Sequence, residues 1–128
     1  MGEAIASRWA VVVTGGRDYR GGQQLFDALD RIKTDCGRVL LVHGGATGAD
    51  AVAQEWANKR AVPQLRWPAD WVKSGRSAGP KRNAAMGSFV AAAFQHVVGV
   101  VCPGGRGTAH MRGVMERHGW PIVEVTDG

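Results

Sequence analysis

The chain has 128 residues, of which 45% are hydrophobic and 21% charged, and its formal net charge is +5. This length suits one domain with one core, and the composition excludes a disordered chain. No apolar run approaches the roughly 20 residues that a membrane-spanning helix needs, and the first ten residues carry neither a secretory signal nor a myristoylation pattern. We expect a single domain over 1–128 with no membrane partner.

The glycine and cysteine contents narrow the class of protein further. The 19 glycines are about twice the usual share of roughly 7%, and they fall in clusters. Cys36 and Cys102 have neither the spacing of a disulfide framework nor a CxxC motif, which indicates a reducing compartment, so we expect a cytoplasmic protein. The four histidines fit no zinc-ligand spacing and predict no metal site: His43, His96, His110 and His118.

The first predicted unit is a strand followed by a helix. Residues 9–14 form a β-branched run ending in two glycines, which predicts a buried parallel strand that leads into a glycine turn. Leu25, Leu29 and Ile32 then recur at the spacing of an amphipathic helix packed on a sheet, and 35–37 end that helix.

The second unit repeats the first. A strand at 39–42 leads into a glycine turn at 43–48, a helix is predicted over 49–60, and a short third strand over 63–67. The segment 68–80 is rich in Gly, Pro and Ser and is predicted to be an irregular loop, the longest in the chain. Loops of that length in compact domains are usually functional or mobile.

The last part of the chain completes the pattern. Pro80 is placed to open a third helix, a strand at 97–102 leads into a glycine turn at 103–108, and Met111 marks the inward face of a fourth helix. A final strand is predicted at 122–125.

Strands and helices therefore alternate along the chain. This order predicts a single Rossmann-like α/β domain, with a mostly parallel five-stranded sheet and helices on both faces. If the strand order is 3-2-1-4-5, the turns at Gly15, Gly44 and Gly104 meet at the carboxyl edge of the sheet, where such folds bind ligands.

The most specific motif is PGGRGT at 103–108. Paired glycines let a backbone approach an anion, and the following helix offers free N–H groups and the positive end of its dipole. The alternative is a tight turn without a ligand, but the convergence of three such turns favours a ligand. The sequence has neither GxGxxG nor a Walker motif, which argues against a dinucleotide dehydrogenase or an NTPase.

Five further side chains have two readings each. Arg17 and Asp18 hold a phosphate and a ribose hydroxyl, or belong to a solvated loop. Asp50 contacts a ribose or caps the second helix. For Arg82, spacing alone favours an exposed helix arginine over a side chain that clamps a phosphate. Cys102 is interpreted as a buried inert thiol rather than a nucleophile.

Basic residues concentrate at 59–82, where seven Lys or Arg face one Asp and give a net charge of +6. Such a segment attracts anions from a single phosphate to a nucleic-acid backbone. Trp67, Trp71 and Tyr19 are able to stack on bases, although core packing is the commoner use of such residues.

Several blocks of the chain resemble the YspA-like, YpsA-related branch of the SLOG superfamily, from about Val11 to Val125. They are VVTGGRDY, HGGATGADAVAQEWA, PADW, AGPKRNAAM and PGGRGTAHM. The superfamily includes the lonely-guy phosphoribohydrolases and the DNA-processing Smf-type proteins. The resemblance implies a Rossmann-like fold and a pocket for nucleotides or nucleotide-derived signals, linked to NAD or ADP-ribose metabolism in one reading.

In the lonely-guy enzymes a PGGxGTxEE motif holds the nucleotide phosphate and supplies two glutamates for cleavage of the N-glycosidic bond, while an arginine in an RKxxM segment assists. The phosphate part and the arginine segment are matched here by Gly104, Gly105, Gly107, Thr108, Arg82 and Met86. Where those enzymes have the glutamates, this chain has His110 and Met111. The resemblance therefore implies binding without the familiar catalysis.

We predict a sensor or sponge for a nucleotide-derived small molecule, without a cofactor, and a homo-oligomer in which Trp120 and the helix at 80–93 are candidate contacts. The alternatives are a nucleotide N-glycosidase with Asp50 or His110 as proton carrier, and single-stranded nucleic-acid binding, which we expect least. The predicted ligand-binding residues are Gly15, Gly16, Arg17, Asp18, Gly44, Gly45, Asp50, Arg82, Asn83, Gly104, Gly105, Arg106, Gly107 and Thr108.

Overall fold

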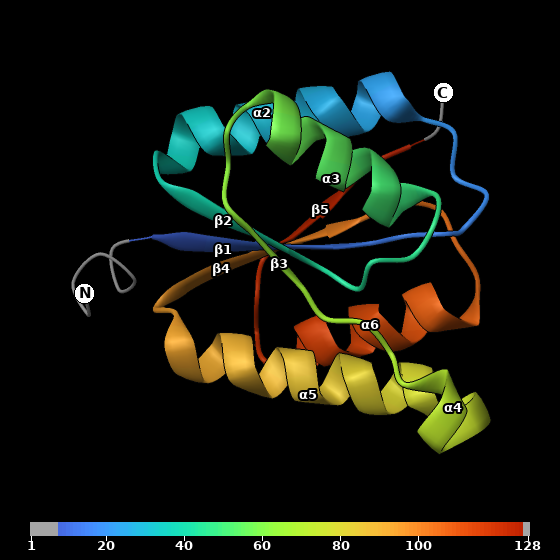
Figure 1. Cartoon of the computed structure of the whole chain (residues 1–128). Coiled ribbons are helices and arrows are strands. Elements are labelled where there is room, and N and C mark those ends of the chain that lie inside the picture. The colour runs from blue at the N-terminus through green and yellow to red at the C-terminus, as the bar shows by residue number, and fades with distance from the viewer. Residues whose placement is uncertain (1–7, 127–128) are drawn as a thin grey trace.

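Five parallel strands form one sheet in the computed structural model, which describes residues 8–126 (Figure 1). The strand order is β3-β2-β1-β4-β5, so the predicted parallel α/β fold is confirmed. The prediction about the first ten residues concerns a segment that lies mostly outside the described ones. The strands are β1 (Trp9–Thr14), β2 (Val39–His43), β3 (Gln64–Arg66), β4 (His96–Val101) and β5 (Ile122–Glu124).

Helices cover both faces of the sheet. Helices α2 (Gly22–Cys36) and α3 (Ala49–Lys59) lie on one face, and α5 (Ala78–Ala93) and α6 (Arg106–Arg117) lie on the other (Figure 1). A hydrophobic core lies on each face of the sheet, and the central strand β1 contributes to both. Val11 and Val13 pack toward α2 and α3, while Ala10 and Val12 pack toward α5 and α6. A strand buried on both faces reads as one continuous apolar run. Within residues 8–126 no helix combines the length and apolarity needed to cross a bilayer.

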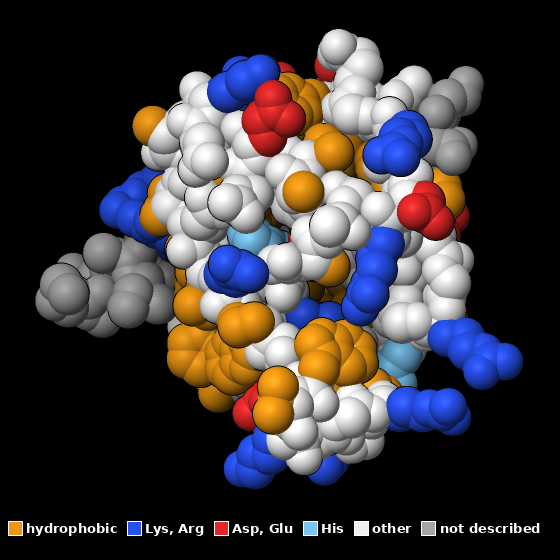
Figure 2. Space-filling model, turned by 45° about the vertical axis from the view of Figure 1, so that its right-hand side comes forward, with side chains coloured by type: hydrophobic (Ala, Val, Ile, Leu, Met, Phe, Trp, Pro, Cys, Tyr) orange, Lys and Arg blue, Asp and Glu red, His pale blue; other side chains and the backbone are white. Residues whose placement is uncertain are grey.

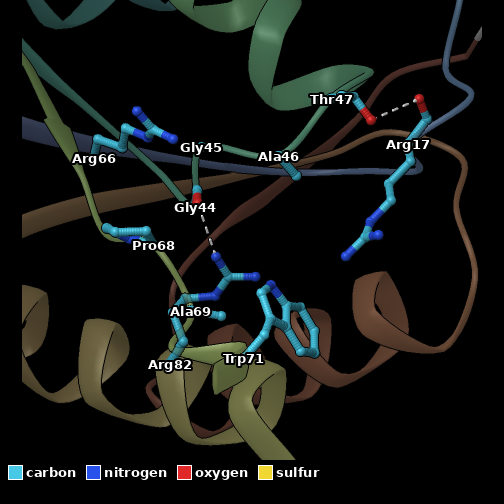
Figure 3. Close-up of a pocket in the computed structure, with 10 residues that line it drawn as sticks. All are labelled: Arg17, Gly44, Gly45, Ala46, Thr47, Arg66, Pro68, Ala69, Trp71 and Arg82. Carbon is cyan, nitrogen blue, oxygen red and sulfur yellow. Dashed lines mark hydrogen bonds between the residues drawn. The ribbon is translucent and has the colours of Figure 1, made fainter. Parts of the chain in front are cut away.

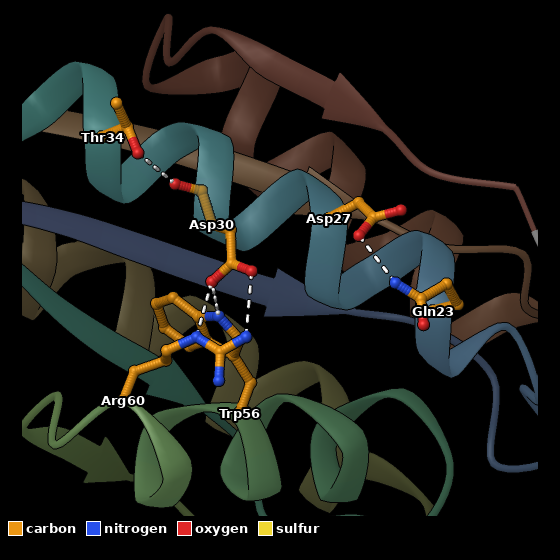
Figure 4. A network of polar contacts seen from close by, with 6 residues as sticks. All are labelled: Gln23, Asp27, Asp30, Thr34, Trp56 and Arg60. Carbon is orange, nitrogen blue, oxygen red and sulfur yellow. Dashed lines mark hydrogen bonds and ion pairs between the residues drawn. The ribbon is translucent and has the colours of Figure 1, made fainter.

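A polar network joins α2 to α3 (Figure 4). The Asp30 carboxylate accepts hydrogen bonds from Trp56 Nε1 at 2.8 Å and from Arg60 Nε and Nη2 at 2.8 and 3.0 Å. The hydrogen bond from Arg60, followed by that from Trp56, lowers the pKa of Asp30 below its usual value. Lys59, next in the chain, forms an ion pair with Glu55 at 3.0 Å. Of the first two cations of the basic segment, Arg60 therefore joins α3 to α2, and Lys59 pairs within α3.

The segment 68–80 is not the irregular loop that its composition predicts. It forms a short helix α4 (Trp71–Ser74) and a 3₁₀ turn η1 (Gly75–Ser77), and α5 begins at Ala78 rather than at Pro80. Asp70 starts α4 by accepting a hydrogen bond from the Lys73 N–H at 3.0 Å. A proline in the first turn of α5 is tolerated because an N–H there has no partner within the helix.

Candidate functional site

Three glycine turns meet at the carboxyl edge of the sheet, as the strand order predicts. The Gly16 N–H donates to the Pro103 carbonyl at 2.8 Å, which joins the turn after β1 to the turn after β4. The Ala49 N–H at the start of α3 donates to the Gly16 carbonyl at 3.2 Å. The backbone thus fixes the three turns against one another.

Some of these glycines are required by this packing. A Cβ at Gly15 would lie 2.5 Å from the Ala49 Cβ and 2.8 Å from the Cys102 Cβ. A Cβ at Gly104 would overlap the Thr108 hydroxyl and lie 2.7 Å from the Gly16 nitrogen. Gly15 and Gly104 therefore let the turns approach each other.

Gly44 and Gly45 serve a different purpose, because arginine side chains lie against them. A Cβ at Gly44 would overlap the Arg82 guanidinium, and one at Gly45 would overlap the Arg66 side chain. Gly45 also has a φ of 75°, which disfavours other residues. Arg66 reaches this turn because parallel pairing places it beside His43, the last residue of β2. Two cationic side chains therefore pack against the turn after β2.

The start of α6 is open. Nothing lies within 4 Å of the Cβ positions built on Gly105 and Gly107, and no side chain caps this helix. Its first i to i−4 hydrogen bond runs from Ala109 to Gly105 at 3.0 Å, so the N–H groups of 106–108 precede it. An uncapped helix start with free N–H groups is suited to bind an anion.

A cleft lies in front of these turns and consists of two adjacent chambers. The α6 chamber, about 280 Å³, is lined by Thr14, Gly15, Gly16, Arg17, Ala46, Asp50, Trp71, Gly79, Arg82, Asn83, Gly105, Gly107 and Thr108. The β2 chamber, about 340 Å³, is lined by Arg17, Gly44, Gly45, Ala46, Thr47, Arg66, Pro68, Ala69, Trp71 and Arg82. Four residues border both chambers. Figure 2 shows Lys and Arg side chains on both sides of a hollow in this face, with apolar side chains below it.

Arg82 lies at the boundary of the two chambers, half-buried, and points toward the turn after β2 (Figure 3). Its Nη1 donates to the Gly44 and Trp67 carbonyls at 3.1 and 3.2 Å, and its Nε donates to Asn83 Oδ1 at 2.7 Å. Spacing alone predicted an exposed helix arginine, which is wrong, because these hydrogen bonds hold the side chain half-buried against the turn after β2. Burial, with the nearby Arg17 charge, lowers the pKa of Arg82 while Asp50 opposes that shift.

Arg17 and Arg66 complete the basic lining. The Arg17 guanidinium lies over the Trp71 ring, 5.6 Å from its centroid (Figure 3). Across residues 8–126 neither Arg17 nor Arg66 forms an ion pair with a carboxylate. Arg66 and Trp71 were not among the predicted ligand-binding residues. The basic segment and the PADW block contain them, but only the β2–β3 pairing and α4 bring them to the cleft.

Asp50 fixes the turn after β2 through hydrogen bonds to its backbone. Its Oδ2 accepts hydrogen bonds from the Gly44 and Ala46 N–H groups, both at 3.2 Å. Burial raises the pKa of Asp50, and the hydrogen bond from Ala46 partly offsets this. His43 supports the same turn, since its Nδ1 accepts from the Gly45 N–H at 3.1 Å and its Nε2 lies 3.0 Å from Gln64 Oε1. This pairing requires a neutral ring with its proton on Nε2.

Other predicted residues lie outside the cleft lining. Asp18, Gly104 and Arg106 are exposed and border neither chamber. His110 also borders neither, and its Nδ1 lies 3.2 Å from Asn83 Nδ2. Burial raises the pKa of the Cys102 thiol to about 11, which fits an inert core cysteine. In the described part of the chain, no three His, Cys, Asp or Glu residues gather as metal ligands.

This architecture defines a Rossmann-like α/β domain with an arginine-lined cleft at the carboxyl edge of its sheet. The chain belongs to the YspA, cpYpsA-related SLOG family, whose model matches residues 9–73. It is also similar to the Gene 61 protein of Mycobacterium phage D29, with 33% identity over 129 residues that cover 91% of this chain and 96% of the phage protein. The family resemblance expected from the motifs is thus confirmed.

Proposed function

We propose that this chain binds a nucleotide-derived small molecule, bearing phosphate and ribose, in the cleft. The observation that carries the proposal is the meeting of the open start of α6 with Arg17 and Arg82 in one chamber. Membership of the SLOG family supports the same ligand class. We further propose that the protein acts as a sensor or sponge for a signalling nucleotide or a NAD or ADP-ribose derivative.

The chemistry of the cleft favours a phosphate over a neutral ligand. The α6 start offers backbone N–H donors, and Arg82 is already fixed by three hydrogen bonds, so binding costs little of its side-chain entropy. A phosphate would also offset the cost of burying this guanidinium. Trp71, half-exposed and bordering both chambers, offers a ring face on which a base can stack.

Two side chains favour binding without turnover: His110 and Met111, which stand where the lonely-guy enzymes have their catalytic glutamates. His110 is directed to Asn83 rather than into the cleft, and Met111 is buried in the core beneath the sheet. Neither side chain is placed to exchange a proton with a ligand in the α6 chamber. Nucleic-acid binding is less favoured, because four of the seven cations of the basic segment are used elsewhere: Lys59 and Arg60 form ion pairs with Glu55 and Asp30, and Arg66 and Arg82 line the cleft.

One observation favours a second candidate, hydrolysis of an N-glycosidic bond. Asp50 borders the α6 chamber, is buried, and has a raised pKa, which are properties of a general acid. Its Oδ2 is engaged by two backbone N–H groups, so Oδ1 is the atom that would carry the proton.

Thermal melting with a panel of nucleotides tests the proposal. The panel contains nucleoside monophosphates of all four bases, cyclic nucleotides, NAD and ADP-ribose, with nucleosides and inorganic phosphate as controls. A ligand present at about 100 times its dissociation constant adds about 2.7 kcal/mol to the free energy of unfolding. We expect at least one nucleotide to raise the Tm, and its nucleoside to have a much smaller effect. If no compound raises the Tm, the proposal is wrong.

A further inference from the structure

The two chambers of the cleft differ in what lines them. Gly105, Gly107 and Thr108 border the α6 chamber alone, whereas Arg66 borders the β2 chamber alone. Arg17 and Arg82 border both. The cleft therefore offers two separate sets of anion-binding groups, linked by two shared arginines.

The β2 chamber has a surplus of positive charge. Three guanidinium groups line it, from Arg17, Arg66 and Arg82, and no carboxylate does. None of the three takes part in an ion pair within the described residues. Like charges gathered in a recess repel one another, and this cost is relieved when an anion binds among them. One phosphate at the start of α6 would leave Arg66, which does not border that chamber, without a counterion.

Arg66 is exposed, but the local structure fixes its position. Its side chain occupies the space of a Cβ on Gly45, and the strand pairing beside His43 fixes its backbone. Trp71 borders both chambers, so a nucleoside stacked on its ring has access to each of them. This arrangement suits a ligand that extends from one chamber into the other.

We infer that the ligand carries two anionic groups at separate positions of one nucleoside, one held at the start of α6 and the other beside Arg66. The inference rests on the proposed function and specifies its ligand class. A nucleoside with phosphates on two different ribose carbons has this form. A diphosphate places both charges on one ribose position and is expected to engage a single chamber.

Calorimetric titration separates these ligands. The probes are 5′-AMP, ADP and adenosine 3′,5′-bisphosphate, with the three guanosine counterparts. For at least one base we expect the 3′,5′-bisphosphate to bind roughly tenfold or more tightly than the monophosphate and the diphosphate, as one added charge-assisted contact gives. Arg66→Gln should remove this gain and leave monophosphate binding within about threefold of wild type, and Arg66→Lys should keep part of it.

Arg76→Gln is the matched control, because Arg76 is exposed on η1 and borders neither chamber. It should leave all affinities unchanged, and the Tm of each variant shows whether it is folded. If a monophosphate binds and the bisphosphate binds no tighter, or if Arg66→Gln weakens every probe equally, the two-anion inference is overturned and the proposed function stands. If no nucleotide binds, both proposals fall.

Discussion

At the scale of single residues, the glycines of this chain have three different roles that composition alone does not separate. Gly15 and Gly104 let neighbouring turns pack, while Gly44 and Gly45 leave room for arginine side chains. Among the glycines of the three turns, Gly105 and Gly107 are those at which the added side-chain position meets open space. A glycine-rich turn is therefore a weak sign of ligand contact until its neighbours are known.

Asp50 provides a residue-scale prediction that separates binding from hydrolysis. In Asp50→Asn the amide oxygen is still able to accept from the Gly44 and Ala46 N–H groups, so we expect the turn and the fold to remain. A binder should retain nucleotide affinity in this variant, and the wild type should release no free base from nucleoside monophosphates. Chromatography of the reaction mixture measures this. Base release by the wild type that Asp50→Asn abolishes would establish the enzyme instead.

At the scale of elements, the open start of α6 predicts that one substitution changes protein stability and phosphate binding in opposite directions. Gly107 is the second residue of α6, where a carboxylate interacts favourably with the helix dipole. Gly107→Asp should therefore raise the stability of the protein by about 0.5 kcal/mol and repel an incoming phosphate. Gly107→Asn has nearly the same shape without the charge and is the control. Urea unfolding measures the stability, and a clear destabilisation by Asp would contradict the open helix start.

The α2–α3 network predicts a pH dependence. The Arg60 and Trp56 hydrogen bonds hold the pKa of Asp30 below its usual value, so the folded state favours the charged form. This contribution is complete above the unfolded pKa and is lost as the pH falls through the lower folded pKa. The Tm of wild type should exceed that of Asp30→Asn at neutral pH, and the difference should shrink below about pH 4. A difference that is constant with pH would rule out this role for the Asp30 charge.

Sequence patterns predicted the larger elements because those elements bury regular apolar faces. The β-branched runs predicted β1 and β4, and the periodic apolar residues predicted α2. The predicted bounds of these elements lie within a few residues of the observed ones. Helix α4 was missed because its signal is a single capping hydrogen bond, which Asp70 accepts from the Lys73 N–H, in a segment rich in glycine, proline and serine. Arg66 was missed because its place depends on the register of β3 beside β2.

At the scale of the whole molecule, the fold brings charge and backbone donors to one edge of the sheet. The strand order places the turns after β1, β2 and β4 side by side, and α4 carries Trp71 to the same edge (Figure 1). Of the seven cations in the basic segment, Arg66 and Arg82 line this cleft, while Lys59 pairs within α3 and Arg60 joins α3 to α2. The cleft is thus a product of the topology, and the charge of the segment alone did not define it.

The central claim is that this cleft holds the phosphate of a nucleotide-derived ligand at the start of α6. Its most direct test is calorimetric titration of adenosine and guanosine nucleotides into the wild type, Gly107→Asn and Gly107→Asp. We predict that at least one nucleotide binds the wild type and Gly107→Asn with one site per chain, and binds Gly107→Asp at least about tenfold more weakly. The claim is contradicted if no nucleotide binds the wild type, or if Gly107→Asp binds as tightly as Gly107→Asn.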